Sequence, residues 1–171
     1  MENILDELAN ARIGRTFNQY AAGPRAHLLR ARLGAYLSAR ADASILLVGE
    51  APGYRGARVS GIPFTSERQL TGTGPAEATA TIVHRALAGL GLEQDVLLWN
   101  VVPTHPGTET TNRAPSRAEV RDGVAFARRL APGRHVIAVG RVAAAALRAP
   151  YVRHPSRGGA RRFVDELRRL V

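Results

Sequence analysis

Four short apolar runs, separated by longer segments with a helical pattern, are the feature that most limits what this chain can fold into. The runs are SILLVG (44–49), VLLWNVV (96–102), HVIAVG (135–140) and YVRH (151–154). Strands that are apolar on both sides and alternate with helices are typical of a parallel sheet covered on both faces. We therefore predict an α/β protein, a three-layer α/β/α sandwich with a central four-stranded, mainly parallel sheet.

Helices are expected between these runs, at about 24–40, 75–90, 116–130, 141–148 and 158–170. Pro24 and Pro75 stand where a proline is tolerated in the first turn of a helix, and Ser116 with Glu119 has the spacing of a capping box. No internal repeat or low-complexity linker interrupts the pattern, and 171 residues suffice for one core. The sequence thus predicts a single domain over residues 1–171.

Composition excludes several classes of protein. The chain has no cysteine, which rules out disulfides and thiolate-held metal clusters. No apolar run reaches the roughly 18 residues that would span a bilayer, and the first fifteen residues carry acids, unlike a secretory signal. None of the five histidines has metal-ligand spacing with nearby acids. We expect a cytoplasmic, monomeric protein without a metal, a cofactor or a membrane partner.

The charge of the chain is strongly basic, with a formal net charge of +10 and arginine as its only basic residue besides histidine. Nine arginines between Arg134 and Arg169 face only Asp165 and Glu166 in the same segment. Because a guanidinium binds phosphate with two parallel hydrogen bonds and stacks on bases, this segment favours a polyanion such as nucleic acid. A solvated basic face is the alternative interpretation.

Polar residues follow three of the predicted strands. Glu50 stands between Gly49 and Pro52 after the first strand, Asn100 ends the second, and His154 follows the fourth. Ligands of parallel sheets bind beyond the carboxyl ends of the strands. Each residue also has an ordinary structural interpretation, as a cap, a partner of loop backbone or a strand-end histidine. Their occurrence at three strand ends nevertheless predicts one site.

Two further segments have plainer interpretations. GTGPAE (72–77) lacks the Lys-Ser/Thr pair of a phosphate-binding P-loop, so it is predicted to be a turn that leads into a helix. Trp99 points, by strand alternation, to the opposite face of the sheet from Asn100 and is expected in the core.

The motifs GEAPG, GIPF, WNVVP with NRAP, VIAVG and RHPS, in this order over about residues 44–165, resemble those of the uracil-DNA glycosylase superfamily. The iron-sulfur branch of bacteria and archaea is the most similar, but this chain lacks the cysteines that hold that branch's cluster. The resemblance implies an enzyme of base excision repair, and the absence of lysine, which could form a Schiff base with the sugar, predicts a monofunctional one. Such an enzyme flips uracil or another deaminated base out of DNA, hydrolyses its N-glycosidic bond and leaves an abasic site.

The resemblance also implies a role for each matching residue. Glu50 would orient or activate water, and His154 would bind the uracil O2 as negative charge develops. Phe64 would stack on the flipped base and Asn100 would read its polar edge, while Gly49 lets the base approach closely. The segment implied to contact DNA comprises Pro155, Ser156, Arg157, Arg161 and Arg162.

Departures from the family pattern leave the lesion open. Where the iron-sulfur branch has acidic residues after GEAPG, this chain has YRGARVS, so Tyr54 or Arg58 could exclude the thymine methyl or contact phosphate. Ser66 and Glu67 could line a pocket of different specificity. Uracil, hypoxanthine, xanthine and mismatched thymine remain candidate substrates, in single- or double-stranded DNA. A non-catalytic binder of damaged or single-stranded DNA and a small-molecule nucleoside hydrolase are the alternative functions.

Overall fold

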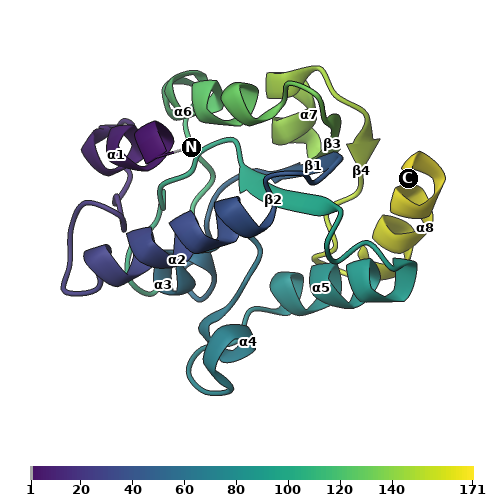
Figure 1. The fold of residues 1–171 in the computed structure, drawn as a ribbon, viewed down its shortest axis with the longest axis horizontal. Coiled ribbons are helices and arrows are strands. Elements are labelled where there is room, and N and C mark those ends of the chain that lie inside the picture. Colours follow the sequence, from purple (N-terminus) through teal and green to yellow (C-terminus); the bar gives the residue numbers. More distant parts are fainter. Residues whose placement is uncertain (1) are drawn as a thin grey trace.

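The computed structural model of the protein describes residues 2–171. One four-stranded sheet has the order β2-β1-β3-β4, and every pair of neighbouring strands is parallel (Figure 1). The strands are β1 (Ile45–Gly49), β2 (Val96–Asn100), β3 (His135–Val139) and β4 (Tyr151–Val152). The predicted four-stranded parallel sheet is thus confirmed, although β4 is only two residues long.

The helices of the described residues are α1 (Glu2–Asn10), α2 (Ala26–Ala39), α3 (Ala57–Ser60), α4 (Glu67–Thr71), α5 (Ala78–Leu90), α6 (Arg117–Leu130), α7 (Arg141–Leu147) and α8 (Ala160–Leu170). The five predicted helices correspond to α2, α5, α6, α7 and α8. The expectation for the two prolines was wrong: α2 and α5 begin at Ala26 and Ala78, so Pro24 and Pro75 precede the first helical turn.

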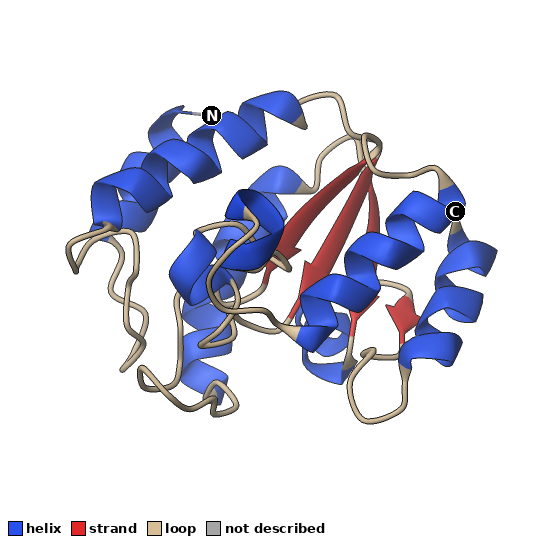
Figure 2. Ribbon diagram, turned by 90° about the horizontal axis from the view of Figure 1, so that it is seen from below, coloured by secondary structure: helices blue, strands red, loops and turns tan. Residues whose placement is uncertain are grey.

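Helices cover both faces of the sheet because the strand residues are apolar on both sides. Leu47, Leu98 and Ile137 pack with α5 and α8, which lie in front of the strands in Figure 2. Leu46 and Trp99 pack on the other face with residues of α1, α2, α6 and α7. The three-layer arrangement is confirmed, and Trp99, 1% exposed, lies in the core as predicted.

The edge of the sheet and the start of α6 are closed by side chains. The amide of Leu98 on the edge strand β2 donates to the Tyr36 hydroxyl of α2 at 2.7 Å. At the start of α6 the Glu119 amide donates to Ser116 Oγ, and the Ser116 amide donates to the Glu119 carboxylate at 2.8 Å. The predicted capping box is confirmed.

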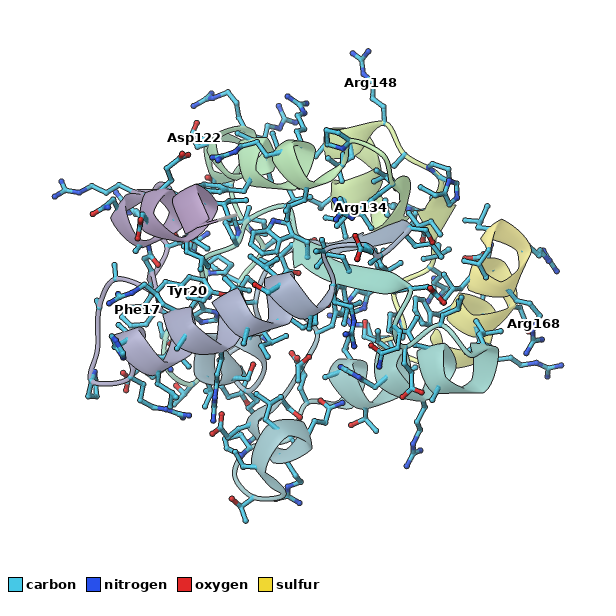
Figure 3. All side chains as sticks on the ribbon, viewed as in Figure 1. Phe17, Tyr20, Asp122, Arg134, Arg148 and Arg168 are labelled. Atoms are coloured by element: carbon cyan, nitrogen blue, oxygen red, sulfur yellow. The ribbon has the colours of Figure 1, made fainter. Side chains whose placement is uncertain are left out.

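The arginines of residues 134–169 do not form one face. Arg134 donates to backbone carbonyl oxygens just before β1 and at the end of α6, so it has a structural role. Arg148 and Arg168 project from different sides of the molecule (Figure 3).

No helix within residues 2–171 is long and apolar enough to span a membrane.

Candidate functional site

A cavity of about 550 Å³ opens at the carboxyl ends of the strands. Because the sheet is parallel, β1 and β2 end side by side, with Gly49 paired in register to Asn100. The end of β4 reaches the same edge through β3. Four residues singled out in the sequence line this one cavity: Glu50, Phe64, Asn100 and His154.

Gly49, Phe64 and Asn100 form one corner of the cavity. A Cβ atom at Gly49 would overlap the Phe64 ring and would lie 3.0 Å from Asn100 Oδ1, so only glycine allows this packing. Phe64 has a φ of 52°, a conformation that costs a non-glycine residue roughly 1–3 kcal/mol and that persists only where the surroundings enforce it. The ring is therefore fixed against the end of β1, beside the buried Asn100 carboxamide.

Glu50 combines a fixed backbone with an unpartnered side chain. Its carbonyl oxygen accepts from the Val102 amide at 3.0 Å, which extends the pairing of the two chains beyond the strands. Its carboxylate has no hydrogen-bond donor among the described residues, and partial burial raises the pKa of Glu50. The carboxylate thus faces the cavity without a protein donor that would neutralise its charge.

The hydrogen bonds of His154 define which ring nitrogen carries the hydrogen. The Ser156 amide donates to His154 Nδ1 at 3.2 Å. Because a backbone N–H only donates, Nδ1 is the acceptor and the neutral ring carries its hydrogen on Nε2. Burial lowers the pKa of His154, which favours this neutral form. The ring can therefore donate one hydrogen bond to a ligand without carrying a charge.

Two contacts tie the loop after β1 to the loop after β2. The fully buried His105 places Nδ1 2.8 Å from the Pro52 carbonyl oxygen and Nε2 2.8 Å from the Thr108 carbonyl oxygen. Asn112 Oδ1 accepts from the Tyr54 amide at 2.9 Å. The loop that carries Glu50 is therefore held at both its middle and its far side.

The five residues implied to contact DNA lie at and beyond one rim of the cavity. Ser156 and Arg157 line it and are exposed, whereas Pro155 is buried. Arg161 and Arg162, on the first turn of α8, are exposed but lie outside the lining. Arg162 Nε is 2.6 Å from Glu166 Oε1, so this guanidinium is already paired in the protein.

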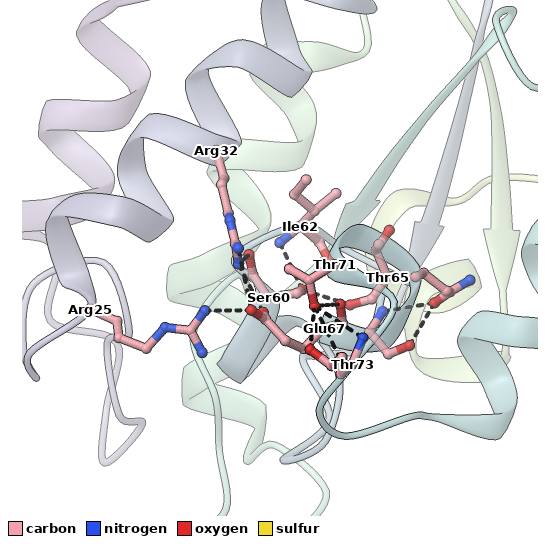
Figure 4. Close-up of polar contacts among 10 residues, drawn as sticks. Arg25, Arg32, Ser60, Ile62, Thr65, Glu67, Thr71 and Thr73 are labelled. Carbon is pink, nitrogen blue, oxygen red and sulfur yellow. Dashed lines mark hydrogen bonds and ion pairs between the residues drawn. The ribbon is translucent and has the colours of Figure 1, made fainter.

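Ser66 and Glu67 do not line the cavity, which corrects the hypothesis that they set its specificity. Ser66 is the N-cap of α4, and Glu67 pairs with Arg25 at 2.7 Å and Arg32 at 2.8 Å (Figure 4). Burial alone would raise the pKa of Glu67, but the hydrogen bonds from Arg32 and Arg25 lower it. This carboxylate joins α4 to α2.

Tyr54 and Arg58 also lie outside the cavity lining. The Arg58 side chain is 14% exposed, and its guanidinium pairs with Glu109 at 3.1 Å and lies 4.9 Å from the centre of the Phe17 ring. Neither side chain is placed to touch a base in the cavity.

Sequence reasoning missed Glu77, Asn112 and Arg113, which all line the cavity. Asn112 and Arg113 belong to the NRAP motif, but no role was assigned to them. Glu77 ends the segment 72–77, which does form a turn before α5 as predicted. The signal that could have found it is a glutamate at the N-cap, where Ser, Thr, Asp or Asn is usual. The described residues contain no cluster of His, Asp and Glu that could hold a metal ion.

Comparison with known proteins gives a family and a fold. A model described as the uracil DNA glycosylase superfamily matches residues 37–167. The crystal structure of wild-type SMUG2 from Pedobacter heparinus is similar, with a TM-score of 0.69 and 12% sequence identity over 97% of this chain and 94% of that chain. No curated protein matches the sequence.

Proposed function

Because the chain belongs to the uracil-DNA glycosylase superfamily, we propose that it removes uracil from DNA by hydrolysing the N-glycosidic bond and leaves an abasic site. The observation that carries this proposal is the cavity at the carboxyl edge of the sheet, where an aromatic ring, a carboxamide, a carboxylate and an imidazole meet. The cavity is concave and sets polar side chains beside an aromatic ring, as expected of a site that orients a small planar ligand.

Base recognition is assigned to Phe64 and Asn100. A base in duplex DNA must leave the stack before an enzyme can reach its glycosidic bond, at a cost of a few kcal/mol. Stacking on an aromatic ring returns roughly 1–3 kcal/mol. The Asn100 carboxamide can pair with both N3–H and O4 of uracil, whereas cytosine presents the opposite pattern. A mismatched amide in a buried site is costly, so Asn100 favours uracil over cytosine.

Bond cleavage is assigned to Glu50 and His154. Breaking the bond to C1′ leaves an oxocarbenium-like sugar and an anionic base, so charge of both signs develops. The Glu50 carboxylate stabilises the cation and orients the attacking water. His154 donates its Nε2 hydrogen to the base O2 as that oxygen becomes negative. The chain has no lysine for a Schiff base with the sugar, which supports a monofunctional enzyme that does not cut the strand.

Contact with DNA is assigned to the rim formed by Ser156 and Arg157 and to the first turn of α8. The net charge of +10 supports attraction to the phosphate backbone. We propose that the protein acts as a monomer in base excision repair.

Base release from single- and double-stranded oligonucleotides tests the proposal. Each strand carries one uracil, hypoxanthine, xanthine or mismatched thymine, and alkaline cleavage reveals the abasic site. We expect release from uracil strands that is lost in Glu50→Ala. A folded protein that binds these strands but releases no base would instead be a non-catalytic binder. Activity on free nucleosides with little salt dependence would indicate a small-molecule hydrolase, because DNA binding weakens steeply with salt.

A further inference from the structure

The cavity contains a second carboxylate to which the proposed reaction gives no role. Glu77 is the N-cap residue of α5, but its side chain makes no capping hydrogen bond and lines the cavity instead. A helix of 13 residues thus begins without a side-chain cap, although such a cap contributes about 1 kcal/mol. The Glu77 side chain is used for the cavity rather than for the helix.

Two glycines of the loop after β1 make room for this carboxylate. A Cβ atom at Gly53 would overlap Glu77 Oε1, and a Cβ atom at Gly56 would overlap Glu77 Oε2. Neither glycine has a positive φ. The Glu77 carboxylate therefore occupies the space that a side chain at either position would need, and a left-handed backbone is not the reason for these glycines. The Glu77 carboxylate rests on backbone and cannot retreat from the cavity in that direction.

The carboxylate has no partner that would explain its place. Within residues 4–171 no donor forms a hydrogen bond with the Glu77 carboxylate, and burial raises the pKa of this carboxyl group. An unpartnered, partly buried carboxyl group disfavours folding. A role in selecting which bases enter the cavity would explain the position of the Glu77 carboxylate.

The proposed function leaves one edge of the pyrimidine unassigned. Asn100 takes N3–H and O4, and His154 takes O2. Glu50 faces the bond from N1 to C1′, while Phe64 covers the ring face. The edge that remains is C5–C6, and Glu77 is the cavity carboxylate without another task.

Resting on that proposed function, we infer that Glu77 is the specificity-determining residue that closes the cavity against bases with a substituent at C5. A hydrogen at C5 fits against the carboxylate. The thymine methyl would have to displace a side chain that is backed by Gly53 and Gly56. This assigns to the residue before α5 the discrimination for which Tyr54 and Arg58 were the candidates, because neither of them lines the cavity.

Glu77→Ala and Glu77→Gln test the inference on strands that carry one uracil, 5-fluorouracil, 5-bromouracil or mismatched thymine. Alanine removes the side chain, whereas glutamine keeps its volume and removes its charge. We expect Glu77→Ala to raise release of thymine and 5-bromouracil relative to uracil at least about tenfold, the scale of one methyl-sized contact. Glu77→Gln should retain the discrimination of the wild type. Glu93→Ala, an exposed glutamate beyond the other end of α5, is the matched control.

Gly53→Ala tests the position of Glu77 independently of catalysis. Its new methyl group should lower the Tm in the wild type, and Glu77→Ala should restore most of that loss in the double variant. Failure of Glu77→Ala to restore the Tm would contradict the close packing of the two residues.

The outcomes separate the inference from the proposed function. A wild type that releases no uracil overturns the proposed function and, with it, the premise of this assignment. A wild type that releases uracil, with an unchanged thymine-to-uracil ratio in Glu77→Ala, overturns the inference alone. Loss of uracil release by more than about a hundredfold in both folded Glu77 variants would also overturn it, because Glu77 would then act in bond cleavage.

Discussion

Glu50 in the cavity is a partly buried carboxylate and Glu119 at the start of α6 is a buried one, yet they differ in the hydrogen-bond donors around them. Glu119, whose side chain is 4% exposed, accepts two hydrogen bonds from Arg113 and one each from the amides of Arg15 and Ser116. Hydrogen bonding by Arg113 holds the pKa of Glu119 at about 2. Glu50 has no donor among the described residues, and burial raises its pKa.

The difference shows how one residue type serves stability in one place and chemistry in another. A carboxylate whose lone pairs are filled by protein donors stabilises the fold and has little charge left for a ligand. A carboxylate without donors costs folding free energy and keeps its charge available. The contrast predicts that substitutions at the two positions separate activity from stability.

The largest effect is expected from Glu50→Gln on activity. Glutamine keeps the volume but cannot stabilise the oxocarbenium-like sugar with a negative charge, so base release should fall at least about a hundredfold. Folding should not suffer, since the substitution removes a carboxylate whose ionised form burial disfavours. The free energy of unfolding at pH 7, from urea titration, should equal or exceed that of the wild type. Full activity in this variant would show that Glu50 does not take part in cleavage.

Glu119→Gln should give the reverse pattern. It breaks the two-point ion pair with Arg113 at a buried position, and we expect a loss of about 2–3 kcal/mol in the free energy of unfolding. Base release by the folded fraction should stay within about threefold of the wild type, because Glu119 does not line the main cavity. Glu109→Gln, whose side chain is 86% exposed, is the control. A comparable loss of unfolding free energy in Glu109→Gln would show that the hydrogen bonds of Glu119 do not stabilise the fold more than an exposed ion pair does.

The fold and the candidate site differ in how far the sequence alone could predict them. The alternation of apolar runs and helices specified the parallel sheet, and a parallel sheet brings Glu50, Asn100 and His154 to one edge. The capping box of α6 was equally local, since Ser116 and Glu119 are three residues apart. Such features depend on neighbours along the chain, and sequence patterns report them directly.

Features built by contacts between distant segments could not be predicted in this way. Glu77 reaches the cavity because Gly53 and Gly56 leave space for it, and His105 ties its own loop to Pro52. Nothing in the turn before α5 indicates such a partner more than twenty residues earlier. Ser66 and Glu67 illustrate the converse error, because their place after GIPF suggested a pocket but their partners lie on α4 and α2.

The pH dependence of activity and stability sharpens the comparison. The pKa of Glu119 lies below its unfolded value of 4.5, so its stabilisation is complete above pH 4.5 and is lost as the pH falls towards 2, by about 3 kcal/mol in all. Glu50 acts in its charged form, and burial raises its pKa above 4.5. Below the pKa of Glu50, uracil release should therefore decline about tenfold per pH unit, while the protein is still folded. The residual release of Glu50→Gln should lack this acid limb. Parallel loss of activity and of near-UV circular dichroism would contradict the separation.

Arg113 belongs to both regions, since it pairs with Glu119 and also lines the cavity. Arg113→Lys keeps the positive charge but replaces the two parallel hydrogen bonds to the Glu119 carboxylate with a single contact. We expect the smallest effect here, a loss of about 1 kcal/mol in stability and a change of a few fold in base release. In a protein that already carries Glu119→Gln, Arg113→Lys should lower the free energy of unfolding by less, because the partner of Arg113 is already lost. Its effect on base release should persist. If both effects vanish in that background, Arg113 acts on the cavity only through Glu119, and the two regions are coupled rather than separate.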